Sequence, residues 1–97
     1  MPTYLTLGKY TAQGLQNIKD APKRVQAFRE AAAKAGVTVK ELRWLAGDYD
    51  IMTLVEAPDE ESVIALGLSI AKQGNVTATR MRTFTAAEAE KIIAKVT

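Results

Sequence analysis

The alternation of apolar and polar residues predicts four β-strands organised around a hairpin. Residues 38–46 and 49–57 are two β-rich runs that flank Gly47-Asp48, a glycine-first pair of the kind that closes a two-residue turn. Residues 3–10 alternate strictly and predict a first strand, and residues 75–84 predict a fourth. We therefore expect the rest of the sheet to assemble on this hairpin.

Side chains alternate across a strand, so the hairpin register predicts two different faces. On the face that we assign to the core, Trp44 lies opposite Ile51, and Leu5 and Leu7 of the first strand join them. Arg80 and Arg82 share the face of Val76, which leaves the inward direction of the last strand open. The other sheet face is expected to form a subunit interface that includes Tyr4, Thr6, Val39, Leu45, Met52 and Leu54.

Apolar residues at helical spacing predict three helices. One runs from Pro22 to Ala35, begins with a proline suited to a first turn and ends before Gly36. A second begins with the acidic residues after Pro58, and its broader apolar face predicts deeper burial. Thr85 and Glu88 form a capping-box pattern at the start of the last helix.

The order of these elements predicts one α+β domain over residues 1–97. A β-α-β-β-α-β order followed by a C-terminal helix fits a ferredoxin-like sandwich with strands in spatial order 4-1-3-2. Its two helices cover one sheet face and leave the other bare. Because monomers seldom expose a large apolar patch, we expect a homodimer or higher homo-oligomer in which the open faces meet.

Composition excludes several kinds of site. The 97 residues contain no cysteine and no histidine, which excludes cysteine nucleophiles, Ser-His-Asp triads and ordinary zinc sites. The acids at residues 59–61 are expected to stabilise a helix start, and we expect no metal, cofactor or catalytic residue. Net charge is only +2, and the third strand lacks stacking aromatics, so no nucleic-acid partner is expected.

The chain carries no pattern typical of a membrane protein. The longest apolar run, Val63 to Ala71, is far too short to cross a bilayer. The N-terminus lacks the basic and apolar regions of a signal peptide. We therefore expect a cytoplasmic, bacterial-type domain without a membrane partner.

The hairpin end of the sheet is the predicted location of any site. The long connection over residues 11–21 starts there and is either a packed loop with one helical turn or a lid over a pocket. Arg43 and Asp50 are diagonal neighbours, which predicts an ion pair. The candidate ligand-binding residues are Tyr10, Thr11, Arg43, Trp44, Tyr49 and Asp50. In the simpler interpretation Trp44 is core, Tyr49 packs beside the turn and Asp50 caps exposed amides.

Gly47, Tyr49 and Asp50 match the motif of the GYD family, small bacterial proteins named for these letters, and the chain resembles that family. The opening MPTYLTLGKYTAQGLQNIKDAPKR and the pattern GNV…F before the last helix are also similar to it. The resemblance implies a dimeric α/β-barrel-like assembly, a frame shared with antibiotic-biosynthesis-type monooxygenases. It implies no particular reaction.

Two functions remain open from the sequence. The first is a small homo-oligomeric binding or accessory module of undefined biochemical role. The alternative is a small-molecule-binding enzyme of the dimeric α/β-barrel, monooxygenase-like type that uses a cavity between sheet and helices. A filled space near Tyr10, Trp44 and Tyr49 favours the first, and an open pocket with polar groups there favours the second.

Overall fold

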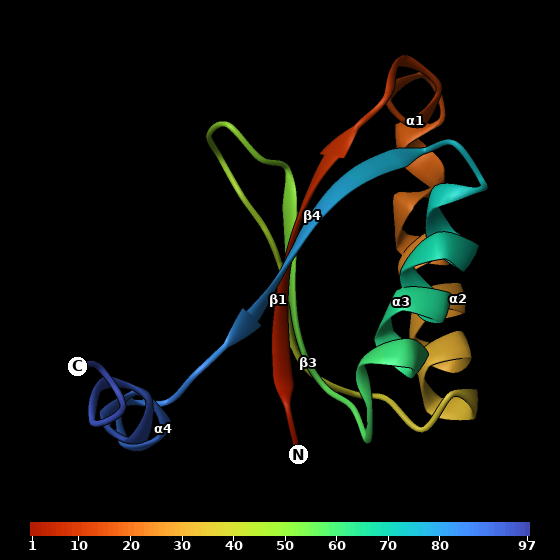
Figure 1. Ribbon diagram of the computed structural model, residues 1–97. Helices are drawn as coiled ribbons and strands as arrows, with labels where there is room; N and C mark the ends of the chain where they lie inside the picture. Colours follow the sequence, from red (N-terminus) through yellow and green to blue (C-terminus); the bar gives the residue numbers. More distant parts are fainter.

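Four antiparallel strands form one sheet in the order β2-β3-β1-β4, in a computed structural model that describes residues 1–97 (Figure 1). The strands are β1 (Thr3–Tyr10), β2 (Thr38–Trp44), β3 (Ile51–Glu56) and β4 (Val76–Thr83). The predicted strand order is confirmed. It places β1 and β3 in the centre and the hairpin strand β2 at one edge.

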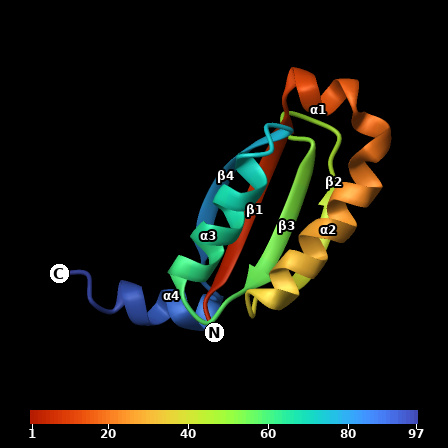
Figure 2. The same ribbon diagram turned by 90° about the vertical axis from the view of Figure 1, so that its right-hand side faces the viewer.

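Helices cover one face of this sheet, as the order of elements predicts. The helical elements are α1 (Ala12–Gln16), the 3₁₀ turn η1 (Ile18–Asp20), α2 (Ala21–Lys34), α3 (Glu60–Ala71) and α4 (Ala86–Ile93). Figure 2 shows α2 and α3 side by side over the strands. The α+β, ferredoxin-like class is therefore confirmed. None of the helices combines the length and apolar character needed to cross a membrane.

The hairpin register is confirmed near its closed end and shifts near its open end. Glu41 pairs with Leu54 and Trp44 with Ile51, as predicted. An irregularity between Val39 and Glu41 then makes Val39 pair with Val55. The unpaired residue between Val39 and Glu41 changes the alternation of the strand. Val39 therefore points to the helix side, where it packs against the core. Its predicted place on the open sheet face is therefore wrong.

The connection between β2 and β3 is a loop over residues 45–50, and the predicted two-residue turn is wrong. Ladder pairing ends at Trp44 and Ile51, and one further backbone bond joins the Leu45 N–H to the Asp50 carbonyl at 2.8 Å. The backbone of Asp50 then turns toward β1, where its N–H donates to the Gly8 carbonyl at 2.8 Å. The Asp50 N–H therefore bonds to β1 instead of returning a hydrogen bond to the Leu45 carbonyl.

The two faces of β1 are opposite to those predicted. Tyr4 pairs with Val55 and is 4% exposed in the core, and Thr6 lies on the same helix-facing side. Leu5 pairs with Leu54, and Leu7 pairs with Met52, on the uncovered side. Both faces of this strand carry apolar groups, so alternation alone does not distinguish them. Tyr4 and Thr6 are therefore corrected from the open face to the helix side.

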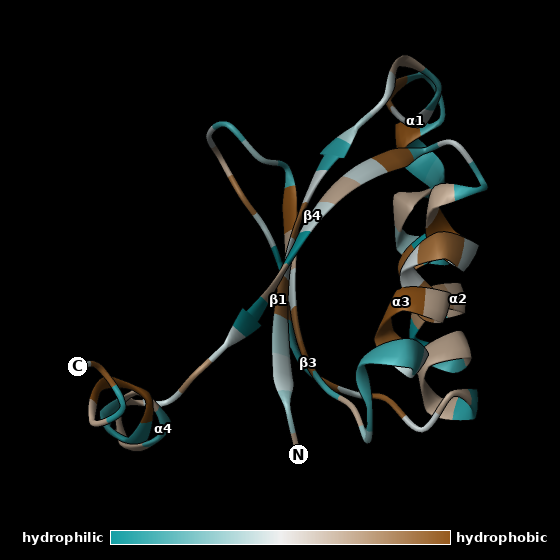
Figure 3. Ribbon diagram, viewed as in Figure 1, coloured by the Kyte–Doolittle hydropathy of each residue, from teal (hydrophilic) through white to brown (hydrophobic).

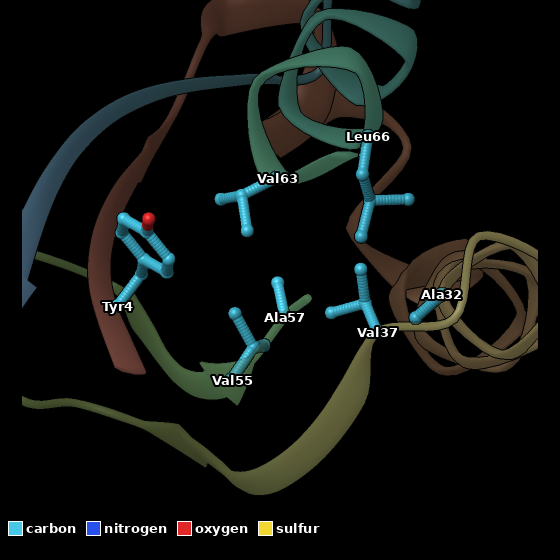
Figure 4. Close-up of a cluster of buried hydrophobic side chains, with 7 residues drawn as sticks. All are labelled: Tyr4, Ala32, Val37, Val55, Ala57, Val63 and Leu66. Carbon is cyan, nitrogen blue, oxygen red and sulfur yellow. The ribbon is translucent and has the colours of Figure 1, made fainter. Parts of the chain in front are cut away.

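A small core fills one end of the space between sheet and helices (Figure 4). It consists of Tyr4, Ala32, Val37, Val55, Ala57, Val63 and Leu66. Helix α2 stops just before Gly36, and the Val37 N–H donates to the Ala32 carbonyl at 2.9 Å. This terminating bond directs Val37 into the core, below α3. Only 10 of the 97 residues are buried, so the core stabilises one end of the domain and leaves the other loosely filled.

Helix α3 is less completely covered than its sequence predicts. Its apolar residues spread around more than the sheet-facing side, so Val63 and Leu66 are buried while Ile64 and Leu68 are 39% and 64% exposed. Helix α4 stands apart, on the side of the sheet opposite α2 and α3 (Figure 1). The predicted capping box begins it, because Thr85 and Glu88 exchange hydrogen bonds of 2.9 and 3.1 Å.

Candidate functional site

A cavity of about 210 Å³ lies between the sheet and helices α2 and α3. It continues from the core toward the end of the sheet where β1 stops, and all four strands contribute to its floor. The lining includes several residues too small to fill the space, among them Gly8, Ala31 and Ala78. The sheet bends around this space in Figure 1. A cavity between sheet and helices, which the enzyme-type alternative requires, is therefore present.

The lining is mostly hydrophobic, and its only charged side chains are basic. Phe28, Leu66 and Ile70 of the helices face Ile51 and Val76 of the sheet across the cavity. The charged lining residues are Arg24 from α2 and Arg80 from β4, and no aspartate or glutamate lines the space. Apolar walls with a few polar groups are typical of small-molecule sites.

Tyr10 marks one end of the cavity. Its hydroxyl accepts a hydrogen bond from Trp44 Nε1 at 2.8 Å. The guanidinium of Arg24 lies 6.0 Å from the centre of its ring and donates to the Asn17 carbonyl at 2.8 Å. Trp44 itself is 51% exposed, so its predicted core position is wrong. It is the last residue of the edge strand β2.

The connection over residues 11–21 is tied to the α3–β4 loop. Thr11 Oγ1 donates to the Gly74 carbonyl at 2.6 Å and accepts from the Gly14 N–H at 3.0 Å. Gln13 Nε2 donates to the Gln73 carbonyl at 2.9 Å and to Asn75 Oδ1 at 3.0 Å. These bonds agree with the interpretation of residues 11–21 as a packed loop. Thr11 caps α1 and does not line the cavity.

Asp50 and Tyr49 lie beside the end of β1 in different roles. Asp50 Oδ2 accepts a hydrogen bond from the Tyr10 N–H at 2.9 Å, which ties the β2–β3 loop to β1. Tyr49 lies against Lys9, whose Nζ is 5.3 Å from the ring centre. Neither side chain lines the cavity between sheet and helices. The aspartate therefore acts as an amide cap, as the simpler interpretation of the motif predicts.

Arg43 is paired within its own strand. Its Nη2 lies 3.2 Å from Glu41 Oε1, and no ion pair joins it to Asp50. The predicted Arg43–Asp50 pair is wrong, because Asp50 turns toward β1 and its carboxylate binds the Tyr10 N–H. Among the six candidate ligand-binding residues, Tyr10 alone lines the cavity.

The sequence interpretation missed the two arginines of the cavity. Arg80 lies on the Val76 face of β4, and that face lines the cavity together with the helices. The apolar Val76 and Ala78 that precede Arg80 on this face were the available signal. Arg24 carried no such signal, because a basic residue on a helix is ordinarily solvated.

The carboxyls with shifted pKa values lie outside the cavity. A hydrogen bond and ion pair from Lys40, with Nζ 2.8 Å from Oε1, lower the pKa of Glu56. The backbone N–H of Ser62 lowers the pKa of Asp59, and that of Thr85 lowers the pKa of Glu88. No group of three or more carboxylate residues is placed to hold a metal ion.

Comparisons with known proteins agree with the fold and indicate a family. The model of the GYD domain matches residues 4–93. The chain is 31% identical over 77 residues to a Thermus thermophilus protein named glutamine synthetase and cystathionine beta-lyase binding protein, covering 78% of this chain and 81% of that one.

Solved structures repeat the same architecture. The crystal structure of a Thermus thermophilus protein matches with 26% identity and a TM-score of 0.57, over 89% of this chain and 96% of that one. The structure of MtbAldR matches with 15% identity and a TM-score of 0.65, over 87% of this chain. This chain spans about half of that protein, 53% of its length, and the likeness concerns the fold alone.

Proposed function

The chain belongs to the GYD domain family, and on this premise we propose that it is a small homo-oligomeric module that binds other proteins and performs no reaction with its own side chains. It has no histidine or cysteine, and the cavity contains no carboxylate that could act as an acid or base. The observation that carries the proposal is the uncovered face of the sheet.

This open face is defined by Leu5, Leu7, Met52, Leu54 and Met81. In the sheet register Leu5 is flanked by Leu54 and Met81, and Leu7 is flanked by Met52. The apolar side chains therefore form one continuous patch across three strands, on the side of the sheet opposite α2 and α3. A patch of this kind is typical of a protein interface.

A second copy of the chain is the proposed occupant of the open face. Glu41 and Arg43 border the patch with one charge of each sign, so the surface can be complementary to itself about a two-fold axis. Helix α4 carries Ile92 and Ile93 away from its own sheet, and Figure 3 shows strongly hydrophobic positions on it. In a dimer, these residues can pack against the partner.

Light scattering tests this oligomer with two substitutions and one control. Met52→Glu and Leu54→Glu place a charge in the patch, and each is expected to convert the dimer to a monomer. Ile64→Glu changes an exposed isoleucine on the outer side of α3 and should leave the mass at two chains. A wild-type mass of one chain, or a dimer that survives both open-face substitutions, would contradict the proposal.

Metabolic enzymes are the proposed partner proteins, because the Thermus thermophilus relative is named for binding glutamine synthetase and cystathionine beta-lyase. Surface plasmon resonance tests this choice of partners, with the purified chain immobilised and either enzyme in solution. Saturable binding to at least one of them is expected. Signals no greater than those of serum albumin for both enzymes would contradict this choice of partners.

The cavity favours a second candidate, the small-molecule-binding enzyme of the dimeric α/β-barrel type. Its open space and polar groups meet the criterion for that function at Tyr10, whereas Trp44 and Tyr49 do not line the space. Such an enzyme would depend on the reactivity of its substrate or of a cofactor. Mass spectrometry of a co-purified small molecule before and after incubation distinguishes the two candidate functions. An unchanged molecule supports a binding module, and a converted molecule supports an enzyme.

A further inference from the structure

We propose that the cavity between sheet and helices binds a small apolar carboxylate, with its charged group at Arg80, Thr6 and Thr53. This site lies on the opposite side of the sheet from the proposed subunit interface. It therefore does not depend on the oligomer or on the partner enzymes, and it can fail while they hold.

The sheet register brings the three polar residues into one row. Thr6 of β1 pairs with Thr53 on one side and with Arg80 on the other, so their side chains lie on the same face. All three line the cavity. The row crosses the floor of an otherwise apolar space, between Gly8 and the buried Tyr4 along β1.

Arg80 is held within the site without a partner for its charge. Its guanidinium lies against the backbone of Gly67 in α3, and a Cβ at Gly67 would collide with Nη2 of Arg80. The ion pairs of the structure are Lys40–Glu56, Glu41–Arg43 and Arg82–Glu88, and none involves Arg80. A half-buried guanidinium beside apolar groups is stabilised strongly by an anion, because little water competes for it.

The hydroxyls beside Arg80 provide further donors. Neither Thr6 Oγ1 nor Thr53 Oγ1 is engaged by another protein group, whereas Thr11, Thr83 and Thr85 all use their hydroxyls in hydrogen bonds. A carboxylate has two oxygens, which match the fork of an arginine and leave lone pairs for a hydroxyl. The row is therefore complementary to a carboxylate.

The charge balance of the lining favours an anion over a cation. Arg24 adds a second positive charge toward the Tyr10 end, and no acidic side chain lines the cavity. Arg24 is already bonded to the Asn17 carbonyl, so it supplies long-range attraction more than direct contact. A ligand cation would meet two like charges and no opposite one.

Volume and lining define the rest of the ligand. An apolar cavity of about 150 Å³ accommodates benzene, so the space of about 210 Å³ accepts a ring or short chain with a carboxylate attached. Phe28, Leu66 and Ile70 of the helices provide apolar contacts above the polar row. An apolar monocarboxylate meets these conditions, and a strongly hydrated polyanion such as a nucleotide does not.

A pair of probes tests the proposal in solution. Isotope-labelled protein is titrated with 3-phenylpropanoate and, in parallel, with the uncharged 3-phenylpropanamide, and binding is followed by NMR. We expect saturable shifts at the methyl groups of Thr6 and Thr53 and an affinity about tenfold higher for the carboxylate. Equal affinities, no saturable binding, or shifts confined to the open face would overturn the proposal.

Matched variants assign the effect to Arg80. Arg80→Met should remove the preference for the carboxylate and leave the affinity for the amide unchanged. Arg82→Met is the control, because Arg82 lies two residues along the same strand but is exposed and paired with Glu88. Thr6→Val removes one donor from the same row without changing side-chain size, and it should also weaken carboxylate binding. The proposal would be overturned if Arg80→Met and Thr6→Val both kept the preference for the carboxylate. If Arg80→Met does not fold, an unchanged preference in Thr6→Val alone would overturn it.

Discussion

Three hydrogen bonds of Asp50 join the β2–β3 loop to the end of β1 and to the residue after β2. Its carboxylate accepts from the Tyr10 N–H at 2.9 Å, its N–H donates to the Gly8 carbonyl, and its carbonyl accepts from the Leu45 N–H. The loop between β2 and β3 is thereby bound to the end of β1. Because Tyr10 also lines the cavity, this residue of the motif positions the candidate site without entering it.

Replacing Asp50 tests this role. Asp50→Ala leaves the Tyr10 N–H without its acceptor, so we expect the free energy of unfolding to fall by about 1 kcal/mol. Asp50→Asn keeps an acceptor oxygen and should lose less. Urea denaturation of the three proteins measures the difference. Equal stability of the alanine variant and the wild type would show that the bond contributes nothing.

Gly47 allows a second test at the same loop. Its φ is +157°, and no atom lies within 4 Å of the position that a Cβ would take. Any cost of a side chain there arises from the backbone, so Gly47→Val should lower stability by about 1 kcal/mol. Ala46→Val is a control in the same exposed loop. Thermal melting compares them, and an unaltered midpoint for Gly47→Val would contradict the prediction.

Among the elements, order and spacing were predictable, and the orientation of individual strands was not. Period-2 and period-3.6 patterns place the strands and the helices α2, α3 and α4 correctly. The face of β1 could not be chosen, because Tyr4 on one side and Leu5 on the other are both apolar. The irregularity before Glu41 moves Val39 to the other face of the sheet. No turn or breaker residue in the sequence predicts this irregularity.

The same limits explain what was missed in the candidate site. Tyr10 was predicted because topology alone brings the end of β1 to the hairpin. Predicting Arg80 required knowing which face of β4 points inward, and predicting Thr6 required the correct face of β1. The sequence pattern decided neither. The side-chain bonds of Trp44 and Asp50 depend on a loop whose path the sequence does not specify.

The starts of α3 and α4 depend on pH in a predictable direction. Backbone N–H groups lower the pKa of Asp59 below 3.8 and that of Glu88 below 4.5. A carboxyl whose pKa is lowered by folding stabilises the native state above its ordinary pKa. This contribution disappears as the pH falls through the lowered value. Both helix starts should therefore weaken below about pH 4.

Circular dichroism measures this loss directly. The helical signal should decline as the pH is lowered through this range and recover on neutralisation. A variant with Asp59→Asn and Glu88→Gln keeps polar caps that do not titrate, so its decline should be smaller. An identical acid titration of variant and wild type would contradict this assignment.

At the scale of the whole molecule, the sheet separates two surfaces with different chemistry. Its helix side holds a cavity with two arginines, and its other side presents the open face of leucines and methionines. With 10 buried residues, the isolated domain has a small core, and a second copy on the open face would add apolar burial. Ile93 at the end of α4 is 65% exposed and Val96 beyond it is 74% exposed, and both would gain cover in the same assembly.

An isotope-filtered NOE experiment on a mixture of labelled and unlabelled chains tests the pairing of open faces most directly. We predict intermolecular contacts among the methyl groups of Leu5, Leu7, Met52 and Leu54. Their complete absence in a sample that still forms dimers, or contacts found only at Ile64 and Leu68 of α3, would contradict a dimer built on the open face.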